Sequence, residues 1–387
     1  GNNVTLNLNN LALTLQSAST GTAYIAQVPA SSSITNSSNF TQQRWLNRNN
    51  VRAGGNATGN YLFVGPIVNG QTVGLWNSVS PYGPNTFNNS VIGGGNFYFF
   101  SSASNNWVKP TSLSQALPAG KGAQVWFGNS GFFAGGRNTW SVTGTPNVGV
   151  FTMPLDNVES FQFISNPYPS TIDWDSPNWT KTNVNNATYI YDWVNRRYRT
   201  YVNGIGVNGG SRYLPTAQGF IIQTSSAAPV LTAREGIKVT NQLALLRQES
   251  PVSGLVRFQI ASGTETDEVV IAQRALATTA FESDVDAQKL MNPSTNIYVS
   301  GTVNQGIASM DLNAINSIPF VIQTSASGSV TLRTTEITGL AGYTFNLFNE
   351  QTGELLPYTG TETYTFNVTA NQPYRMQLRV GAITGIE

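Results

Sequence analysis

The chain of 387 residues contains neither cysteine nor histidine. This absence excludes disulfide bonds, Ser-His-Asp and Cys-His nucleophiles, and the usual ligand sets of zinc, haem and iron–sulfur centres. Charged residues make up only 10% of the chain, whereas soluble domains typically have about 25%. Asn, Ser, Thr, Gln and Gly take the places that charges normally hold. Lack of cysteine does not indicate the cytosol, because a large secreted chain can fold without disulfides.

Acidic residues are missing from the first part of the chain, where none precedes Asp156. Residues 1–155 therefore carry +6, and the remainder, with 19 acids against 14 bases, carries −5. This asymmetry favours either end-to-end contact between copies of the chain or a first half simply covered by neutral side chains. We favour the second interpretation, because so few charges give a weak field at physiological salt. The six bases are Arg44, Arg48, Arg52, Lys109, Lys121 and Arg137.

Long hydrophobic runs are also absent. No stretch of 18 or more apolar residues occurs, so the sequence predicts no transmembrane helix. The N-terminal residues GNNVTLNLNN lack the basic start and the apolar core of a signal peptide. We therefore expect either a mature secreted chain or a fragment.

What the sequence does have is alternation with a period of two, which predicts β-strands. Apolar residues alternate with Thr and Asn over residues 4–8 and 11–15, and Asn-Gly dipeptides predict tight turns at 69–70, 203–204 and 208–209. Between Val256 and Val380 we expect about nine short strands. They predict a β-sandwich of the jelly-roll or Greek-key type. One short helix is expected at Ser283–Met291, where Ser283 and Asp286 form a capping-box pattern.

The first half repeats one pattern after about 100 residues. YLFVGPIVNGQTVGLWNS from Tyr61 matches SFQFISNPYPSTIDWDS from Ser160, and ALPAGKGAQVWF from Ala116 matches YLPTAQGFIIQT from Tyr213. We predict that the two copies pack together. The predicted organisation is an all-β chain with two domains. Residues 1–228 form a β-domain with two pseudo-repeats, at about 60–128 and 160–225, and residues 229–387 form a jelly-roll or Greek-key-like β-sandwich.

Several segments together resemble a known family. Ser165–Ser176 is similar to the NPYPS-x-IDW motif of large surface proteins that Bacteroidota secrete through the type IX system. Leu214–Thr224, Thr143–Gly149 and Thr266–Leu290 resemble further segments of these proteins. Residues 378–387 look like the stretch that precedes their sorting domain, which is absent here, as expected if it is cleaved at export. The resemblance implies export across the outer membrane and an extracellular, cell-surface location, and it implies little about activity.

Catalytic arrangements that need neither Cys nor His are largely missing as well. No lysine has a serine three residues before it, residue 1 is glycine, and no G-x-x-x-x-G-K-[ST] phosphate loop occurs. A carboxylate pair at Asp173 and Asp175 remains, as in glycoside hydrolases. We favour a turn-stabilising role for this pair. The sequence therefore predicts that the chain is not an enzyme.

Acidic residues gather between Glu265 and Asp286, where hard oxygen ligands could suit Ca²⁺. No loop of the D-x-[DN]-x-[DN]-G type orders them, so we favour a solvated strand edge followed by a capped helix. We expect no other cofactor. The candidate calcium ligands are Asp267, Glu268, Asp284 and Asp286.

Two surface features suggest ligands. Eight Trp and 15 Tyr would include glycan-stacking rings if they are exposed, although most fall on positions expected in the core. The basic run Asn195–Tyr201 could meet an anionic polymer, but we favour a solvated strand and expect no nucleic-acid partner. The sequence thus predicts an extracellular structural protein of the bacterial surface that assembles with its own copies into a filament, sheath or layer. The alternative is a monomeric adhesin or carbohydrate-binding module of a longer surface protein.

Overall fold

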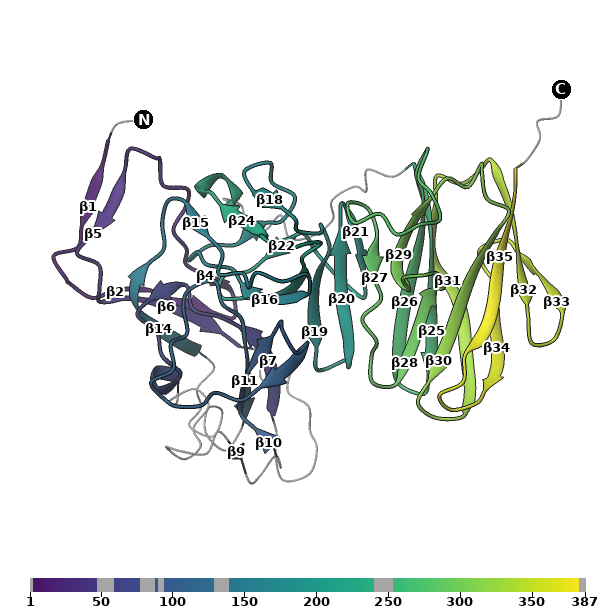
Figure 1. The fold of residues 1–387 in the computed structure, drawn as a ribbon, viewed down its shortest axis with the longest axis horizontal. Helices are drawn as coiled ribbons and strands as arrows, with labels where there is room; N and C mark the ends of the chain where they lie inside the picture. The colour runs from purple at the N-terminus through teal and green to yellow at the C-terminus, as the bar shows by residue number, and fades with distance from the viewer. Residues whose placement is uncertain are drawn as a thin grey trace. The chain divides into compact units, whose positions relative to one another are not determined.

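The computed structural model describes residues 3–46, 59–76, 88–89, 94–128, 139–239 and 253–382. In these residues the regular structure is β, with short 3-10 turns and no α-helix (Figure 1). The predicted all-β class is therefore confirmed. The chain divides into two compact units. The first unit comprises residues 1–185 and 212–247, and the second comprises residues 186–211 and 248–387. The sequence-based division at residue 228 assigned residues 186–211 to the first domain, whereas in the structure they belong to the second unit.

Short strands in several small sheets build the first unit. They are β1 (Thr5–Asn7), β2 (Leu13–Leu15), β3 (Ser17–Ala18), β4 (Gly21–Thr22), β5 (Ser33–Thr35), β6 (Phe40–Trp45), β7 (Gly59–Val64), β8 (Val68–Asn69), β9 (Asn88–Asn89), β10 (Gly94–Gly95), β11 (Phe97–Ser101), β12 (Asn106–Val108), β13 (Ala123–Gly128), β14 (Thr139–Pro146), β15 (Phe151–Thr152), β16 (Phe161–Ser165), β17 (Ile172–Asp173), β18 (Thr180–Thr182), β22 (Tyr213–Leu214), β23 (Gly219–Gln223) and β24 (Val230–Ala233). The 3-10 turns are η2 (Val73–Trp76) and η4 (Glu235–Ile237).

The two pseudo-repeats share a pairing pattern. In one copy β7 pairs antiparallel with β13, and in the other β16 pairs antiparallel with β23. The copies meet through reciprocal glycines. A Cβ at Gly122 would lie 2.8 Å from the Phe163 ring, and one at Gly219 would lie 2.8 Å from the backbone of Phe63. The Phe63 and Phe163 rings are 4.6 Å apart. The Phe163 ring therefore packs on the backbone at Gly122, and the backbone at Gly219 packs on the backbone of Phe63.

The second unit is dominated by one large curled sheet. Its strands are β25 (Gly254–Ser262), β26 (Glu265–Gln273), β27 (Ala287–Gln288), β28 (Thr295–Val299), β29 (Gln305–Met310), β30 (Ser317–Thr324), β31 (Gly328–Thr338), β32 (Tyr343–Asn349), β33 (Glu354–Tyr358), β34 (Thr363–Val368) and β35 (Tyr374–Ala382). The order is β33-β32-β35-β30-β28-β29-β26-β25-β31-β34, and β27 pairs with β29. Nine of these strands were predicted, whereas the short strands β27 and β33 were not.

Alternate residues of this sheet face a single apolar core, which is the packing of a β-sandwich. Val256, Phe258 and Ile260 of β25 are fully buried, and the Phe258 and Phe320 rings stack 5.6 Å apart. Residues 186–211 form a separate meander in the same unit: β19 (Thr188–Asp192), β20 (Arg197–Val202) and β21 (Ile205–Val207). The predicted turn at 203–204 joins β20 to β21, with positive φ at both residues.

The predicted helix after the capping-box pattern is wrong. Residues 283–285 form a turn, and β27 follows directly. The Asp286 carboxylate is buried and accepts hydrogen bonds from the backbone N–H of Glu282, at 2.8 Å, and of Ser309, at 2.7 Å. The second bond ties the turn to β29. Tertiary hydrogen bonding thus overrides a short local helical pattern.

Candidate functional site

Three of the segments that carry the family resemblance meet inside the first unit, around Asn166. This side chain is fully buried. Its Nδ2 donates to the carbonyls of Ser170, Leu214 and Pro215 at 2.7–3.0 Å, and its Oδ1 accepts from the Tyr168 N–H at 2.9 Å. One amide group therefore closes the NPYPS turn and joins it to the LPTAQGF segment. The motif has a structural role, because its buried amide is hydrogen-bonded to the backbone of both segments.

A buried ion pair connects this network to the TGTPNVG segment. Glu235 Oε2 lies 2.7 Å from the Lys238 ammonium, and Glu235 Oε1 accepts from the Gly149 N–H at 2.6 Å. The ammonium also lies 4.7 Å above the Tyr168 ring, and the Tyr168 hydroxyl donates to the Gly149 carbonyl. Burial lowers the pKa of Lys238, and its contact with Glu235 opposes that shift. Burial also raises the pKa of Tyr168. Glu235, Lys238 and Tyr168 therefore interact with one another and with the backbone of Gly149.

The carboxylate pair of the same motif is held by an arginine. Both oxygens of Asp173 accept from the Arg212 guanidinium, and Asp175 Oδ2 lies 3.6 Å from it. The Asp175 N–H donates to Asp173 Oδ1 at 3.0 Å, which is the bond of an Asx turn. This is the turn-stabilising arrangement favoured from the sequence.

The acidic candidates for calcium lie in two places in the second unit. Asp267 and Glu268 are neighbours on β26, and Asp284 and Asp286 lie in the turn before β27. Asp267 is fully buried, accepts from the Ile297 N–H at 2.8 Å, and is paired with the Lys289 ammonium. Within the described ranges no group of three or more acids is arranged to hold a metal ion.

The basic run on β20 is engaged by side chains of its own unit. Arg199 lies 2.6 Å from Asp192, Arg196 lies 3.5 Å from Glu265, and Arg197 donates to Thr266. Burial alone would raise the pKa of Asp192, but hydrogen bonds from Asn195 and Arg199 hold it below its usual value. Several aromatic side chains lie in the core, as expected from the sequence. Buried tryptophans of the first unit are Trp76, Trp140, Trp174 and Trp179.

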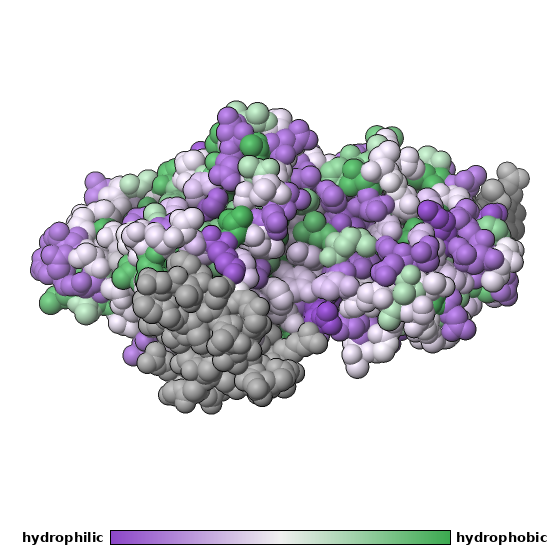
Figure 2. Space-filling view, turned by 60° about the horizontal axis from the view of Figure 1, so that its bottom comes forward, coloured by the Kyte–Doolittle hydropathy of each residue, from purple (hydrophilic) through white to green (hydrophobic). Residues whose placement is uncertain are grey.

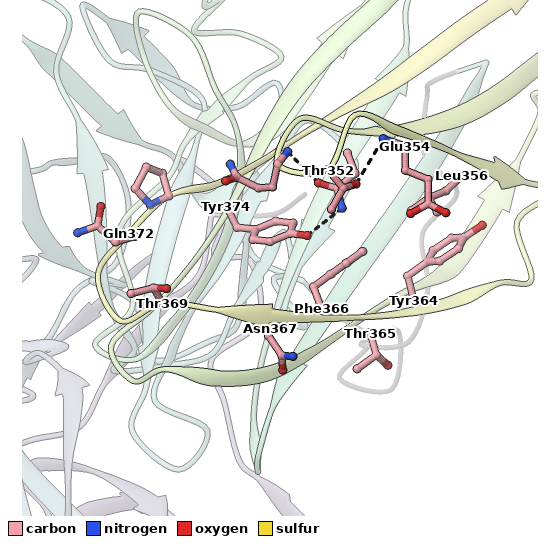
Figure 3. A pocket seen from close by; sticks show the side chains of 13 residues that line it. Thr352, Glu354, Leu356, Tyr364, Thr365, Phe366, Asn367, Thr369, Gln372 and Tyr374 are labelled. Atoms are coloured by element: carbon pink, nitrogen blue, oxygen red, sulfur yellow. Dashed lines mark hydrogen bonds between the residues drawn. The ribbon is translucent and has the colours of Figure 1, made fainter.

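Sequence reasoning missed a groove at the two edges of the large sheet. The strands β33 and β34 are the end strands of the sheet order, so each has one hydrogen-bonded neighbour in the described part of the chain. Between them lies a cavity of about 520 Å³. Figure 3 shows the rings of Tyr374, Phe366 and Tyr364 in a row along it. The Tyr364 and Phe366 rings are 6.4 Å apart and nearly parallel, and Phe366 and Tyr374 are 5.2 Å apart.

The lining of the groove also includes polar side chains. Among them are Asn349, Thr352, Asn367 and Gln372 (Figure 3). The loop 359–362 joins β33 to β34, and the Glu362 carboxylate accepts hydrogen bonds from three backbone N–H groups of that loop. Bonds from Thr359 above all lower the pKa of Glu362 to about 2. The groove is thus a slot with an apolar floor between β33 and β34, which this tight loop connects.

A second feature lies in the N-terminal segment whose alternation the sequence shows, where β1 pairs with β5 to form the N-terminal ribbon. The pairing is parallel and three residues long. Every side chain of β1 is exposed, Leu6 at 49%, and Val4, just before the strand, is 58% exposed. Leu11, just after it, is 70% exposed. On the face drawn in Figure 2 hydrophobic residues are otherwise scattered among hydrophilic ones.

Comparison with known proteins gives no match. No family model matches the chain, and neither a curated protein nor a solved structure is significantly similar to it. In the described ranges, no helix has the length and hydrophobicity needed to cross a membrane. The family resemblance therefore stays a prediction from the quoted segments.

Proposed function

We propose that the chain is an extracellular structural protein of the bacterial cell surface, which assembles with its own copies into a filament, sheath or layer. The observation that carries this proposal is the N-terminal ribbon, where the apolar side chains of Val4 and Leu6 are exposed. Large exposed apolar side chains grouped on one strand favour an interaction surface. An exposed strand edge also offers unpaired backbone groups to another chain.

Composition and charge support the same proposal. Low charge and abundant amide side chains limit repulsion between copies. The +6 of residues 1–155 and the −5 of the remainder are complementary. The resemblance to type IX cargo supports export and display outside the cell. The residues of its principal motif are engaged in a buried structural network, which suits a scaffold protein.

The assembly state of purified protein tests the proposal. We expect sedimentation velocity at increasing concentration to give a growing polymeric fraction, and negative-stain images to contain filaments or sheets of regular spacing. Raised salt should weaken assembly, because screening reduces attraction between oppositely charged parts. A monodisperse monomer at high concentration, with no polymer on the surface of cells, would contradict it.

A second candidate function is favoured by the row of three rings in the groove. Aromatic faces stack on sugar rings, and Asn, Gln and Thr at the rim offer hydrogen bonds to hydroxyls. This arrangement favours the alternative of an adhesin or carbohydrate-binding module within a longer surface protein. A glycan array probed with the purified chain tests it, and we would expect retention of one class of oligosaccharide and loss of retention after Tyr374→Ala.

A further inference from the structure

The groove of the second unit and the ribbon of the first have complementary chemistry. We propose that the N-terminal strand of one copy, residues 4–8, inserts into the groove between β33 and β34 of a second copy. The inference rests on the proposed self-assembly and names its donor and acceptor surfaces. Because the two surfaces differ, the contact is head-to-tail, and repeating it makes an open polymer unless the rotation between copies closes a ring.

The acceptor has two strand edges and an apolar floor. Pro357 of β33 has no N–H, and its carbonyl accepts from the Tyr364 hydroxyl of β34. This contact shows that the Pro357 carbonyl points toward β34 and not toward β32. In an antiparallel pair, residues two apart have the same backbone orientation, so the N–H and C=O of Leu355 also point away from β32. An incoming strand can pair with these groups while its side chains meet Leu356 and Phe366.

The donor has the matching pattern. Val4, Leu6 and Leu8 fall on one face of an extended strand, with Thr5 and Asn7 on the other. No charged residue occurs before Arg44, so insertion desolvates no charge on the donor. The strand is tied to its own chain by a three-residue pairing with β5 and by hydrogen bonds of Val4, Asn7 and Leu8 to residues 32–36. Insertion exchanges these exposed contacts for pairing in the groove.

Charge complementarity favours a second copy as the occupant. The acceptor region, residues 334–374, contains four acids and no Lys or Arg. The donor is followed by the acid-free segment that continues to residue 155 and carries +6. One of the four acids, Glu354, lines the groove itself. A neutral strand in the slot would therefore bring a cationic segment against a region of net negative charge. The four acids are Glu336, Glu350, Glu354 and Glu362.

The test uses a donor variant of the full chain, Val4→Ser with Leu6→Ser. Both positions are exposed, so folding should be unaffected. We expect this variant to form no polymer alone. Its groove is intact, so added to wild type it should cap growing ends and shorten the polymers as its proportion rises. The matched control is Leu276→Ser, which removes an apolar side chain that is 91% exposed elsewhere. It should polymerise like wild type.

A peptide of residues 3–9, NVTLNLN, provides a measurement that does not require polymer. Hydrogen exchange of the full chain with this peptide should show slower deuterium uptake in 354–358 and 363–368. A control peptide of the same composition, in which the apolar residues are adjacent and do not alternate, should not slow deuterium uptake in these strands. If the donor variant polymerises normally, the inference is overturned while the proposed function stands. If wild type forms no polymer, the proposed function fails, and absence of peptide protection then overturns the inference as well. Protection of these strands by an oligosaccharide and not by the peptide would overturn it in favour of a glycan site.

Discussion

The two units bury their strands by different means. In the second unit β25 and β26 pair over nine residues, and ten strands share one apolar core. In the first unit many strands are two to six residues long, and buried amide groups such as Asn166 bond to backbone carbonyls between them. In long strands the backbone N–H and C=O groups are hydrogen-bonded by strand pairing. Short strands leave some of these groups without a strand partner, and side chains must form the hydrogen bonds instead. A chain rich in Asn and Gln can therefore build a unit with little regular sheet.

The largest effect is expected where the apolar core of the second unit is broken. Phe258→Ala should lower the free energy of unfolding by about 3–5 kcal/mol, since it leaves a cavity beside Phe320. Hydrogen exchange followed by mass spectrometry should show faster exchange in β25 and β26. Peptides from 161–165 and 219–223 in the first unit should change little. Equal destabilisation of both units would contradict their separate cores.

The polar network of the first unit is broken by Asn166→Ala. We expect a loss of about 3 kcal/mol, because the buried carbonyls of Ser170 and Leu214 and the Tyr168 N–H lose the hydrogen bonds that the Asn166 amide makes to them. Seven of the eight tryptophans lie in the first unit and only Trp193 in the second. Urea unfolding followed by Trp fluorescence therefore reports mainly this unit. The exposed Asn39→Ala is the control, and a loss for it as large as for Asn166→Ala would refute the special role of the buried amide.

Two acids of the second unit should respond to pH in opposite directions. Burial raises the pKa of Asp286 to about 6. Its ionisation therefore costs the folded state stability as pH rises from about 4 through 6, by at most about 3 kcal/mol. Relative to wild type, Asp286→Asn should gain stability between pH 4 and pH 7. Asp192 has a lowered pKa, so Asp192→Asn should lose stability at pH 7, and that loss should shrink as pH falls below about 4. Melting temperatures of wild type and the two variants, measured across this pH range, test both predictions. If the difference from wild type changed with pH in the same way for both variants, the opposite pKa shifts of Asp286 and Asp192 would be contradicted.

The smallest effect tests the contact between the pseudo-repeats. Gly219→Ala places a Cβ 2.8 Å from the backbone of Phe63 and Val64, which should cost about 1–2 kcal/mol through overpacking. Gly21→Ala is the matched control, because a Cβ there has no atom within 4 Å. Urea unfolding of the two variants measures the difference. A Gly219 variant as stable as the control would mean that the copies can move apart without cost.

The sequence predicted the regular parts of this fold and not the parts that depend on tertiary pairing. Nine strands of the second unit and the turn at 203–204 follow from local alternation and from Asn-Gly chemistry. The turn at 283–285 does not follow from the local sequence, because it depends on the hydrogen bond between Asp286 and the distant Ser309. The groove could not be predicted from the local sequence either. The strands β33 and β34 are joined by the short loop 359–362, yet they lie at opposite ends of the sheet order and do not pair. Local sequence does not show that such neighbours leave a groove instead of forming a hairpin, because this depends on how the whole sheet curls.

Cryo-electron microscopy of the assembled wild-type protein would test the central claim most directly. The account predicts a polymer in which an additional strand, with the side chains of residues 4–8 of the neighbouring copy, lies between β33 and β34. A polymer whose groove is empty while copies touch elsewhere would contradict the donor and acceptor assigned here. Single particles without any polymer would contradict self-assembly itself.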